Sequence, residues 1–389
     1  MKKFITLIFF VMVFFSEFTN VDAKSAEKTS IIWSNDVLTM SNSSSSILNY
    51  KDSRGNLIVR DAIAQALTWK LKQLQMSGDL PFDLEESAIK YDDMHSVSGD
   101  DPIGLIPIAT LDTSFDTKYS AGKKTYYRSL VFCGLSIAIC SADSLSSSWK
   151  ILATIPLSGY DFIGDNLDDP RTEPISDEEK AHAFIEIASN LIRNNLDFSS
   201  YKDRKLFRDL DLKSLGGAKY KTYQVDEVLI TSNKASEIFY GRENEIKSIV
   251  AAFFTSNYQR KSQNIVLPSR INSRWKIDVA KNLYTYQMQT PSGSVVNLSA
   301  DQPDETIQLE IYGLNSKEIE TKKPSDVKRD ILYKAWMRKF PADKNSDLSD
   351  STIRRELITD GAAIEYNPAD VYTLLLIDVA ENLGNQKKN

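Results

Sequence analysis

Only two histidines occur in the sequence, His95 and His182, so any reaction that uses an imidazole must use one of them. His95 lies in the acidic segment 91–96, whose side chains could hold a metal ion or complete a Ser-His-Asp group. No Gly-x-Ser-x-Gly motif is present to supply the nucleophile of such a group. We therefore expect His95 to be a solvated loop residue.

His182 is the better candidate for a metal ligand. Glu178 and Glu186 lie one helical turn before and after it, so the three side chains share one stripe and could bind a divalent cation. The stripe continues through Ser189 and Arg193, opposite the apolar face of the same helix, which is typical of a solvent-exposed surface. The sequence therefore favours a solvated face, and we expect no tight metal site here.

An acidic segment runs from Asp161 to Asp177 and includes Asp165, Asp168 and Glu173. Carboxylates at this density could bind calcium weakly outside the cell. Their spacing does not match the EF-hand pattern, which needs Gly at its sixth position and Glu at its twelfth. The alternative is a solvated loop whose acids favour the N-terminus of the following helix through its dipole.

The two cysteines, Cys133 and Cys140, lie seven positions apart in one apolar run. On one straight strand they would be about 23 Å apart, too far to bond. A hairpin disulfide would require the chain to reverse between them, so we predict buried free thiols and keep the disulfide as the alternative. Neither cysteine has a histidine nearby in the sequence, which argues against a catalytic thiol.

Two further motifs carry no chemistry. Ser-x-x-Lys recurs at Ser120, Ser147 and Ser273, as a chain rich in Ser and Lys should show by chance, and its partner motifs are absent. The segment 122–125 resembles the end of a P-loop, but Thr117 stands where the motif needs glycine. We therefore predict no catalytic residue, no cofactor and no metal ligand.

Composition restricts the class of protein. The chain has 389 residues, 47 Lys and Arg against 53 Asp and Glu, and 42% apolar residues, so it can bury a sizeable core. The net charge of -6, without a basic block, argues against nucleic-acid binding. Residues 1–23 have the order of a signal peptide: Lys2 and Lys3, an apolar run over 4–15, and small residues before Lys24. That run is shorter than the roughly 20 residues that span a bilayer, so we expect export and no stable membrane span.

The remaining chain divides into two parts. A polar linker is expected over 24–56, a first domain over 57–198, a second linker over 199–221 and a second domain over 222–389. In the first domain, apolar periodicity predicts a helix over 61–76, strands over 105–111, 125–141 and 149–157, and a helix opened by a capping box of Ser176 and Glu179.

The second domain begins with a strand over 223–231. It continues with a helix over 242–257, strands over 264–267, 283–290 and 306–313, and a helix over 325–340. Two C-terminal helices should pack on this domain: one over 350–359, and one with Asn367 as N-cap, Pro368 in its first turn and Gly384 just past its end.

These elements predict an α+β protein built of two small mixed modules, each with the order helix, strand, strand, strand, helix. The shared order suggests an internal duplication, although unrelated α+β domains can share such an order by chance.

The leading functional hypothesis is an exported, periplasmic or secreted, non-enzymatic binding or assembly protein of the bacterial envelope that acts through protein or polymer contacts. The alternative is a metal-dependent or carboxylate-based hydrolase that uses Glu178, His182 and Glu186 or the Asp161–Asp177 loop. The sequence does not encode the partner or the oligomeric state.

Overall fold

The computed structural model combines helices with one large mixed sheet, which confirms the α+β class. It describes residues 30–40, 46–80, 82–96, 102–121, 123–143, 148–164, 171–198, 221–262, 265–271, 274–278, 283–320, 329–342, 351–359 and 367–385. The predicted signal peptide and all but the last residue of the predicted 199–221 linker lie outside these residues. In the described part of the chain, no helix is both long and apolar enough to cross a membrane.

A three-stranded antiparallel sheet forms the centre of the first half. We call it the first meander; it consists of β4 (Ile103–Ala121), β5 (Lys124–Asp143) and β6 (Ser148–Ile163). The helices α2 (Ile58–Met76) and α3 (Asp177–Asn195) share a hydrophobic core with one of its faces. These elements match the predicted helices and strands, but each strand is longer than its apolar run suggested.

The helices form where apolar side chains recur every three or four residues. The buried face of α2 includes Ile63, Leu67 and Leu71. The predicted capping box opens α3: the Ser176 hydroxyl accepts from the backbone N–H of Glu179, whose carboxylate accepts from the backbone N–H of Ser176. Each large side chain on these faces stabilises the fold by about 1.5–3 kcal/mol when it is fully buried.

The second half repeats this arrangement. The second meander consists of β12 (Glu305–Glu320), β13 (Arg329–Pro341) and β14 (Ser351–Thr359). The helices α6 (Glu243–Ser262) and α7 (Pro368–Asn385) pack against each other and share a core with one face of this meander.

Both meanders carry an extra parallel strand. β1 (Ser30–Trp33) pairs in parallel with β4, and β7 (Thr222–Ile230) pairs in parallel with β12. The smaller elements are β2 (Leu38–Thr39), β3 (Asp83–Leu84), β8 (Ile265–Val266), β9 (Arg274–Asp278), η1 (Ile47–Asn49), η2 (Asp92–Ser96) and α5 (Asn233–Ile238).

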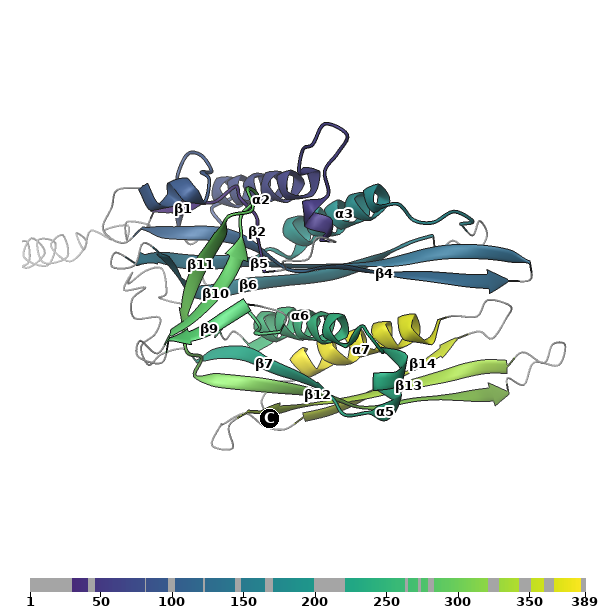
Figure 1. Ribbon diagram of the computed structural model, residues 1–389. Coiled ribbons are helices and arrows are strands. Elements are labelled where there is room, and N and C mark those ends of the chain that lie inside the picture. Colours follow the sequence, from purple (N-terminus) through teal and green to yellow (C-terminus); the bar gives the residue numbers. More distant parts are fainter. Residues whose placement is uncertain are drawn as a thin grey trace, which may run out of the picture.

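The layers alternate between helices and strands (Figure 1). From top to bottom in that view lie α2 and α3, the first meander, α6 and α7, and the second meander. The lower face of the first meander contributes Phe115 and Phe132 to the same core as α6 and α7. The first meander is therefore covered by helices on both faces.

A hairpin from the second half closes the first sheet into a ring. β10 (Leu283–Gln289) and β11 (Val295–Asp301) pair with each other; β11 pairs with β6, and β10 pairs with β2, which pairs with β4. All of these strands contribute to one core cluster that contains Trp149 and Tyr286. The hairpin thus completes a small barrel at one end of the first meander.

Two predicted helices are wrong. Residues 325–340 were expected to form a helix, but β13 occupies Arg329–Pro341, and the helix expected over 350–359 is β14. On β13, Leu332, Trp336 and Phe340 project from one face of the strand at four-residue spacing, which imitates a helical stripe. Between them, Tyr333 and Met337 are buried on the other face.

Part of the stretch expected to be a linker without elements is structured. Within 24–56, β1, β2 and η1 contribute buried side chains, among them Ile31, Trp33 and Leu48. The strands are too short to produce a periodic signal. The final helix has Asn367 as N-cap, as predicted, since its Oδ1 accepts from the backbone N–H of Ala369 at 3.0 Å.

Gly384 has a different role from the predicted one, because α7 runs through it. A Cβ atom there would lie 2.8 Å from the backbone oxygen of Phe254 on α6. The glycine therefore allows the two helices to pack closely.

Candidate functional site

The lower face of the second meander is not covered by another element in the described ranges (Figure 1). On β13, buried Tyr333, Ala335 and Met337 alternate with Trp336 and Arg338, which point away from α6 and α7. We call this surface the open face. It consists of Gln308, Glu310, Lys334, Trp336, Arg338, Phe340, Thr352, Arg354 and Glu356.

Two arginine guanidinium groups lie over aromatic rings on the open face. The guanidinium carbon of Arg354 lies 5.4 Å from the ring centre of Trp336, and that of Arg338 lies 5.3 Å from the ring centre of Phe340. The Trp336 ring covers Gly313 on β12, where an added Cβ would lie 2.8 Å from the ring. Trp and Arg are the residue types enriched at the energetic centres of protein interfaces.

Ion pairs connect the strands of the open face. Arg338 bonds to Glu310 across β12 and β13, and Nζ of Lys334 lies 3.0 Å from Oε1 of Glu356 across β13 and β14. The ammonium group of Lys334 holds the pKa of Glu356 below its usual value. The open face is therefore made of ion pairs and arginine–aromatic contacts and is not a purely apolar patch.

The open face ends at β14. Among the residues that the structure describes, β14 pairs only with β13, so its outer row of backbone N–H and C=O groups has no strand beside it. An open groove follows this edge and the end of α7, lined by Thr352, Ile353, Arg354, Arg355, Asn382 and Asn385.

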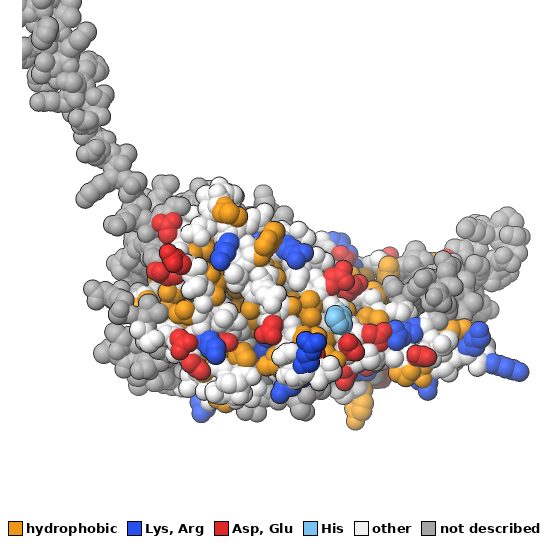
Figure 2. Space-filling model, turned by 90° about the horizontal axis from the view of Figure 1, so that it is seen from above, with side chains coloured by type: hydrophobic (Ala, Val, Ile, Leu, Met, Phe, Trp, Pro, Cys, Tyr) orange, Lys and Arg blue, Asp and Glu red, His pale blue; other side chains and the backbone are white. Residues whose placement is uncertain are grey.

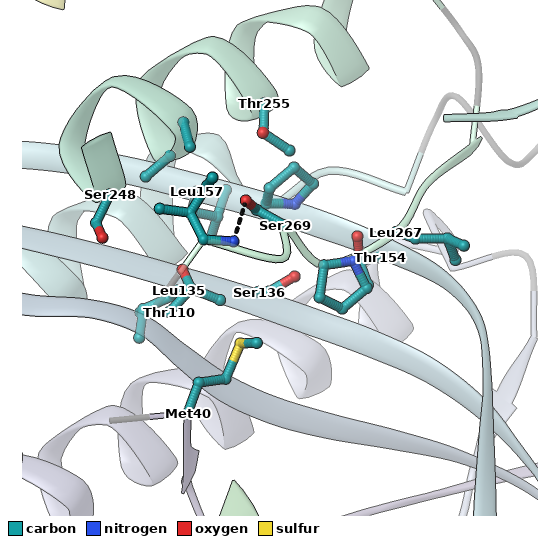
Figure 3. Close-up of a pocket in the computed structure, with 15 residues that line it drawn as sticks. Met40, Thr110, Leu135, Ser136, Thr154, Leu157, Ser248, Thr255, Leu267 and Ser269 are labelled. Atoms are coloured by element: carbon teal, nitrogen blue, oxygen red, sulfur yellow. Dashed lines mark hydrogen bonds between the residues drawn. The ribbon is translucent and has the colours of Figure 1, made fainter. Parts of the chain in front are cut away.

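A small cavity lies between the first meander and α6 (Figure 3). A β-bulge at Thr110 interrupts the pairing of β4 with β5 at this point. The segment 267–271 forms another wall, where the Ser269 hydroxyl accepts from the backbone N–H of Ile271 at 3.1 Å. The cavity volume is about 40 Å³, which is room for roughly three water molecules.

The cavity offers hydroxyl groups and no titratable side chain. Its polar lining residues are Thr110, Ser136, Thr154, Ser248, Thr255 and Ser269. The buried Oγ1 of Thr255 makes no hydrogen bond to the described residues, which suits a water-filled space. General acid–base chemistry needs a group that can exchange a proton near neutral pH, and none lines this cavity.

A second polar cluster lies under η1. The Asp112 carboxylate accepts from the Ser46 hydroxyl, and burial raises the pKa of Asp112 to about 6. Arg60 is buried nearby and donates to the backbone oxygen of Val37 at 2.6 Å and to Oδ1 of Asn49 at 2.8 Å. The Ser46 bond attaches the N-terminal segment to β4, and the Arg60 bonds attach it to α2, so we assign the cluster a structural role.

The predicted His182 stripe is a solvent-exposed helix face. Glu178 and His182 lie 3.9 Å apart with about two thirds of each side chain exposed, and Glu186 is exposed as well. The surface over α2 and α3 intersperses acidic, basic and apolar side chains (Figure 2). Among the described residues, no group of three or more His, Cys, Asp or Glu side chains is placed to hold a metal ion.

The acidic loop is only partly described. Asp161 lies at the end of β6, and Asp177 begins α3, but 165–170 lie outside the described residues. Calcium binding by this loop therefore remains an expectation from the sequence. His95 lies in η2, and its side chain is outside what the structure describes.

The cysteines behave as predicted. Both lie on β5, both are buried, and both are free thiols. Burial raises the pKa of each thiol, so neither is an activated nucleophile.

Sequence reasoning missed the open face because it assigned β13 and β14 to helices. The usable signal is the alternation of Tyr333, Ala335 and Met337 with charged or aromatic residues, which has a period of two. It also missed Asp112, which follows the apolar run of β4 and is one of two acids on that strand.

No protein-family model matches the chain, and no curated protein is significantly similar to it.

Proposed function

We propose that this chain is an exported binding or assembly protein of the bacterial envelope, and that it acts through protein contacts made by the open face. Export rests on the N-terminal sequence pattern alone. The open face carries the proposal of binding, because the aromatic rings of Trp336 and Phe340, each next to an arginine, lie on a surface that ends at the edge of β14, where no described strand pairs. Such a surface can supply both buried anchors and backbone hydrogen bonds to a partner.

The competing hypothesis is a hydrolase that uses Glu178, His182 and Glu186 or the acidic loop. An enzyme of this type should bring carboxylates together in a concave pocket. The exposure of the His182 stripe and the neutral lining of the cavity lend this hypothesis no support. We therefore favour binding over catalysis.

We also propose that the two halves are copies of one duplicated unit. Each half contains a helix, a three-stranded meander and a second helix, and each meander has a parallel strand on its first member. The equivalent strands are then β4 with β12, β5 with β13 and β6 with β14. If this is correct, the open face is the counterpart of the lower face of the first meander, which packs on α6.

Site-specific crosslinking tests the proposed contact surface. A photo-crosslinking aromatic residue replaces Trp336 in the expressed protein, and the same residue replaces His182 as the control on the α3 surface. We expect a discrete adduct with another envelope protein from position 336 and none from position 182. Equal adduct patterns from both positions, or none from 336, would argue against the open face as the binding surface.

A further inference from the structure

The nine-residue strand β14 has a self-complementary charge pattern. Arg354 and Glu356 project from the open face, two positions apart, and they bond to each other along the strand. Between them Arg355 projects to the other face, where its Nε lies 2.9 Å from Oδ2 of Asp378 on α7. The strand therefore presents a basic and an acidic residue symmetrically on either side of Arg355.

This pattern selects one antiparallel register for two β14 strands. If Arg355 lies on a two-fold axis, Arg354 of each copy lies directly opposite Glu356 of the other. A shift of the axis by one residue in either direction places Arg354 opposite Arg354, or Glu356 opposite Glu356, which is unfavourable. Of these three registers, the one centred on Arg355 is therefore the one that gives two favourable charge pairs.

The other face of the strand is compatible with the same register. Ile353 of each copy lies opposite Leu357 of the other, and Leu357 is among the exposed apolar side chains of the chain. The two Arg355 side chains meet at the axis, but each guanidinium already has the carboxylate of its own Asp378. The axis therefore brings together two neutral ion pairs rather than two isolated positive charges.

In the first meander, the edge that corresponds to that of β14 is the outer edge of β6. The outer edge of β6 carries other strands: β11 pairs at Trp149, Lys150 and Ile151, and β8 pairs at Thr154. The edge of β14 has no such strand among the described residues. In the first meander, therefore, further strands pair along the outer edge of the third strand.

We propose that two copies of this chain associate edge to edge through β14, antiparallel, with Arg354 of each copy opposite Glu356 of the other. The association would join the two second meanders into one sheet and place the two open faces side by side. The dimer rests on the proposed binding function only because it would place two open faces in one assembly. The dimer proposal can be wrong even if crosslinking at Trp336 supports the open face as the binding surface.

Charge reversal tests the register. Arg354→Glu leaves two acids at these positions and Glu356→Arg leaves two bases, so each variant alone places like charges opposite each other. Mixed in equal amounts, the two variants restore opposite charges across the axis. Glu178→Arg reverses a charge on the distant α3 surface and is the control.

Sedimentation velocity follows the association from about 1 to 300 μM, the range in which a small interface dissociates. We expect the wild type and Glu178→Arg to dimerise, each single β14 variant to have a dissociation constant raised about tenfold or more, and the mixture to recover affinity close to that of the wild type. A wild type that stays monomeric, β14 variants that dimerise like the wild type, or a mixture that does not recover would each overturn the proposal.

Hydrogen exchange covers the case in which a variant does not fold. In the wild type, the β14 amides that point away from β13 should exchange more slowly as the concentration rises through the dimerisation range. Unchanged exchange in β14 of a sample that dimerises would place the interface elsewhere and overturn the proposal.

Discussion

The two meanders have the same strand order, but they are buried differently. β5 of the first meander is buried at every position from Leu130 to Cys140, because helices cover both of its faces or the ring closes over them. β13 of the second meander is buried only at alternate positions, with Lys334, Trp336 and Arg338 on the open face. The two strands differ because β5 is covered on both faces and β13 on one. In the sequence, β5 is therefore a nearly continuous apolar run, whereas β13 alternates apolar and polar or partly exposed residues.

The largest expected effect on stability comes from comparing one aromatic residue on the middle strand of each meander. Phe132 on β5 is fully buried against α6, with its ring 5.3 Å from that of Phe115, whereas Trp336 on β13 lies on the open face. We expect Phe132→Ala to reduce the free energy of unfolding by about 3–5 kcal/mol. We expect Trp336→Ala to reduce it by about 1 kcal/mol or less, because its ring is only partly buried.

Urea denaturation of both variants and the wild type measures the two losses. A loss for Trp336→Ala as large as that for Phe132→Ala would mean that something covers the open face, and the contrast between the meanders would fail.

The helices α2 and α3 could be predicted because their burial is one-sided, so their apolar side chains form a single stripe with a period of 3.6 residues. The helices α6 and α7 lie between the two meanders and are buried over most of their surface, so their length and local signals had to identify them. Ser176 of α3 and Asn367 of α7 are N-caps, and an N-cap is a local signal. The strands of the first meander could be predicted because no helix-like spacing competes with their apolar runs. β13 could not, because its outer face places Leu332, Trp336 and Phe340 four residues apart.

Long-range pairing was beyond the sequence pattern. Nothing in 283–301 indicates that this hairpin pairs with β6 and β2 of the other half, since a ring is closed by contacts between residues far apart in the chain. The open face was missed for the same reason: its residues come from three strands whose neighbours must be known first. The exposed His182 stripe, by contrast, lies on one helix, and its exposure followed from the stripe opposite Phe184.

The second prediction concerns acids in the two regions. The pKa of Asp112 is raised to about 6 by burial, against about 3.9 in an unfolded chain. The folded state therefore binds this proton more tightly, so its contribution to stability is fully present below about pH 4 and lost as the pH rises through 6. We expect the difference in unfolding free energy between wild type and Asp112→Asn to shift against the wild type by roughly 2–3 kcal/mol between these pH values.

Glu356 on the open face should behave in the opposite sense. Its pKa is lowered, mainly by the hydrogen bond from Lys334, so its contribution is present at neutral pH and lost as the pH falls. Denaturation of Asp112→Asn, Glu356→Gln and the wild type from about pH 3, below the ordinary pKa of a glutamate, to about pH 7 separates the two signs. A pH dependence unchanged by Asp112→Asn would show that this carboxyl group is not buried in the folded protein.

The smallest effect is expected from the redox state of the cysteines. Cys133 faces α2 and α3, Cys140 lies in the ring core, and both belong to the first meander, which is covered on each side. We therefore expect neither thiol to react with a thiol reagent until the protein unfolds, and reductant to leave the melting temperature unchanged. A cysteine introduced by Thr352→Cys, exposed on β14, should react at once and serves as the matched control on the open face.

The double variant Cys133→Ala/Cys140→Ala should lose no more than a few kcal/mol of unfolding free energy, because each thiol contributes only as a small apolar group. A clear fall in melting temperature on adding reductant would reveal a disulfide, and β5 would then have to bend between the two residues instead of running straight through the covered sheet.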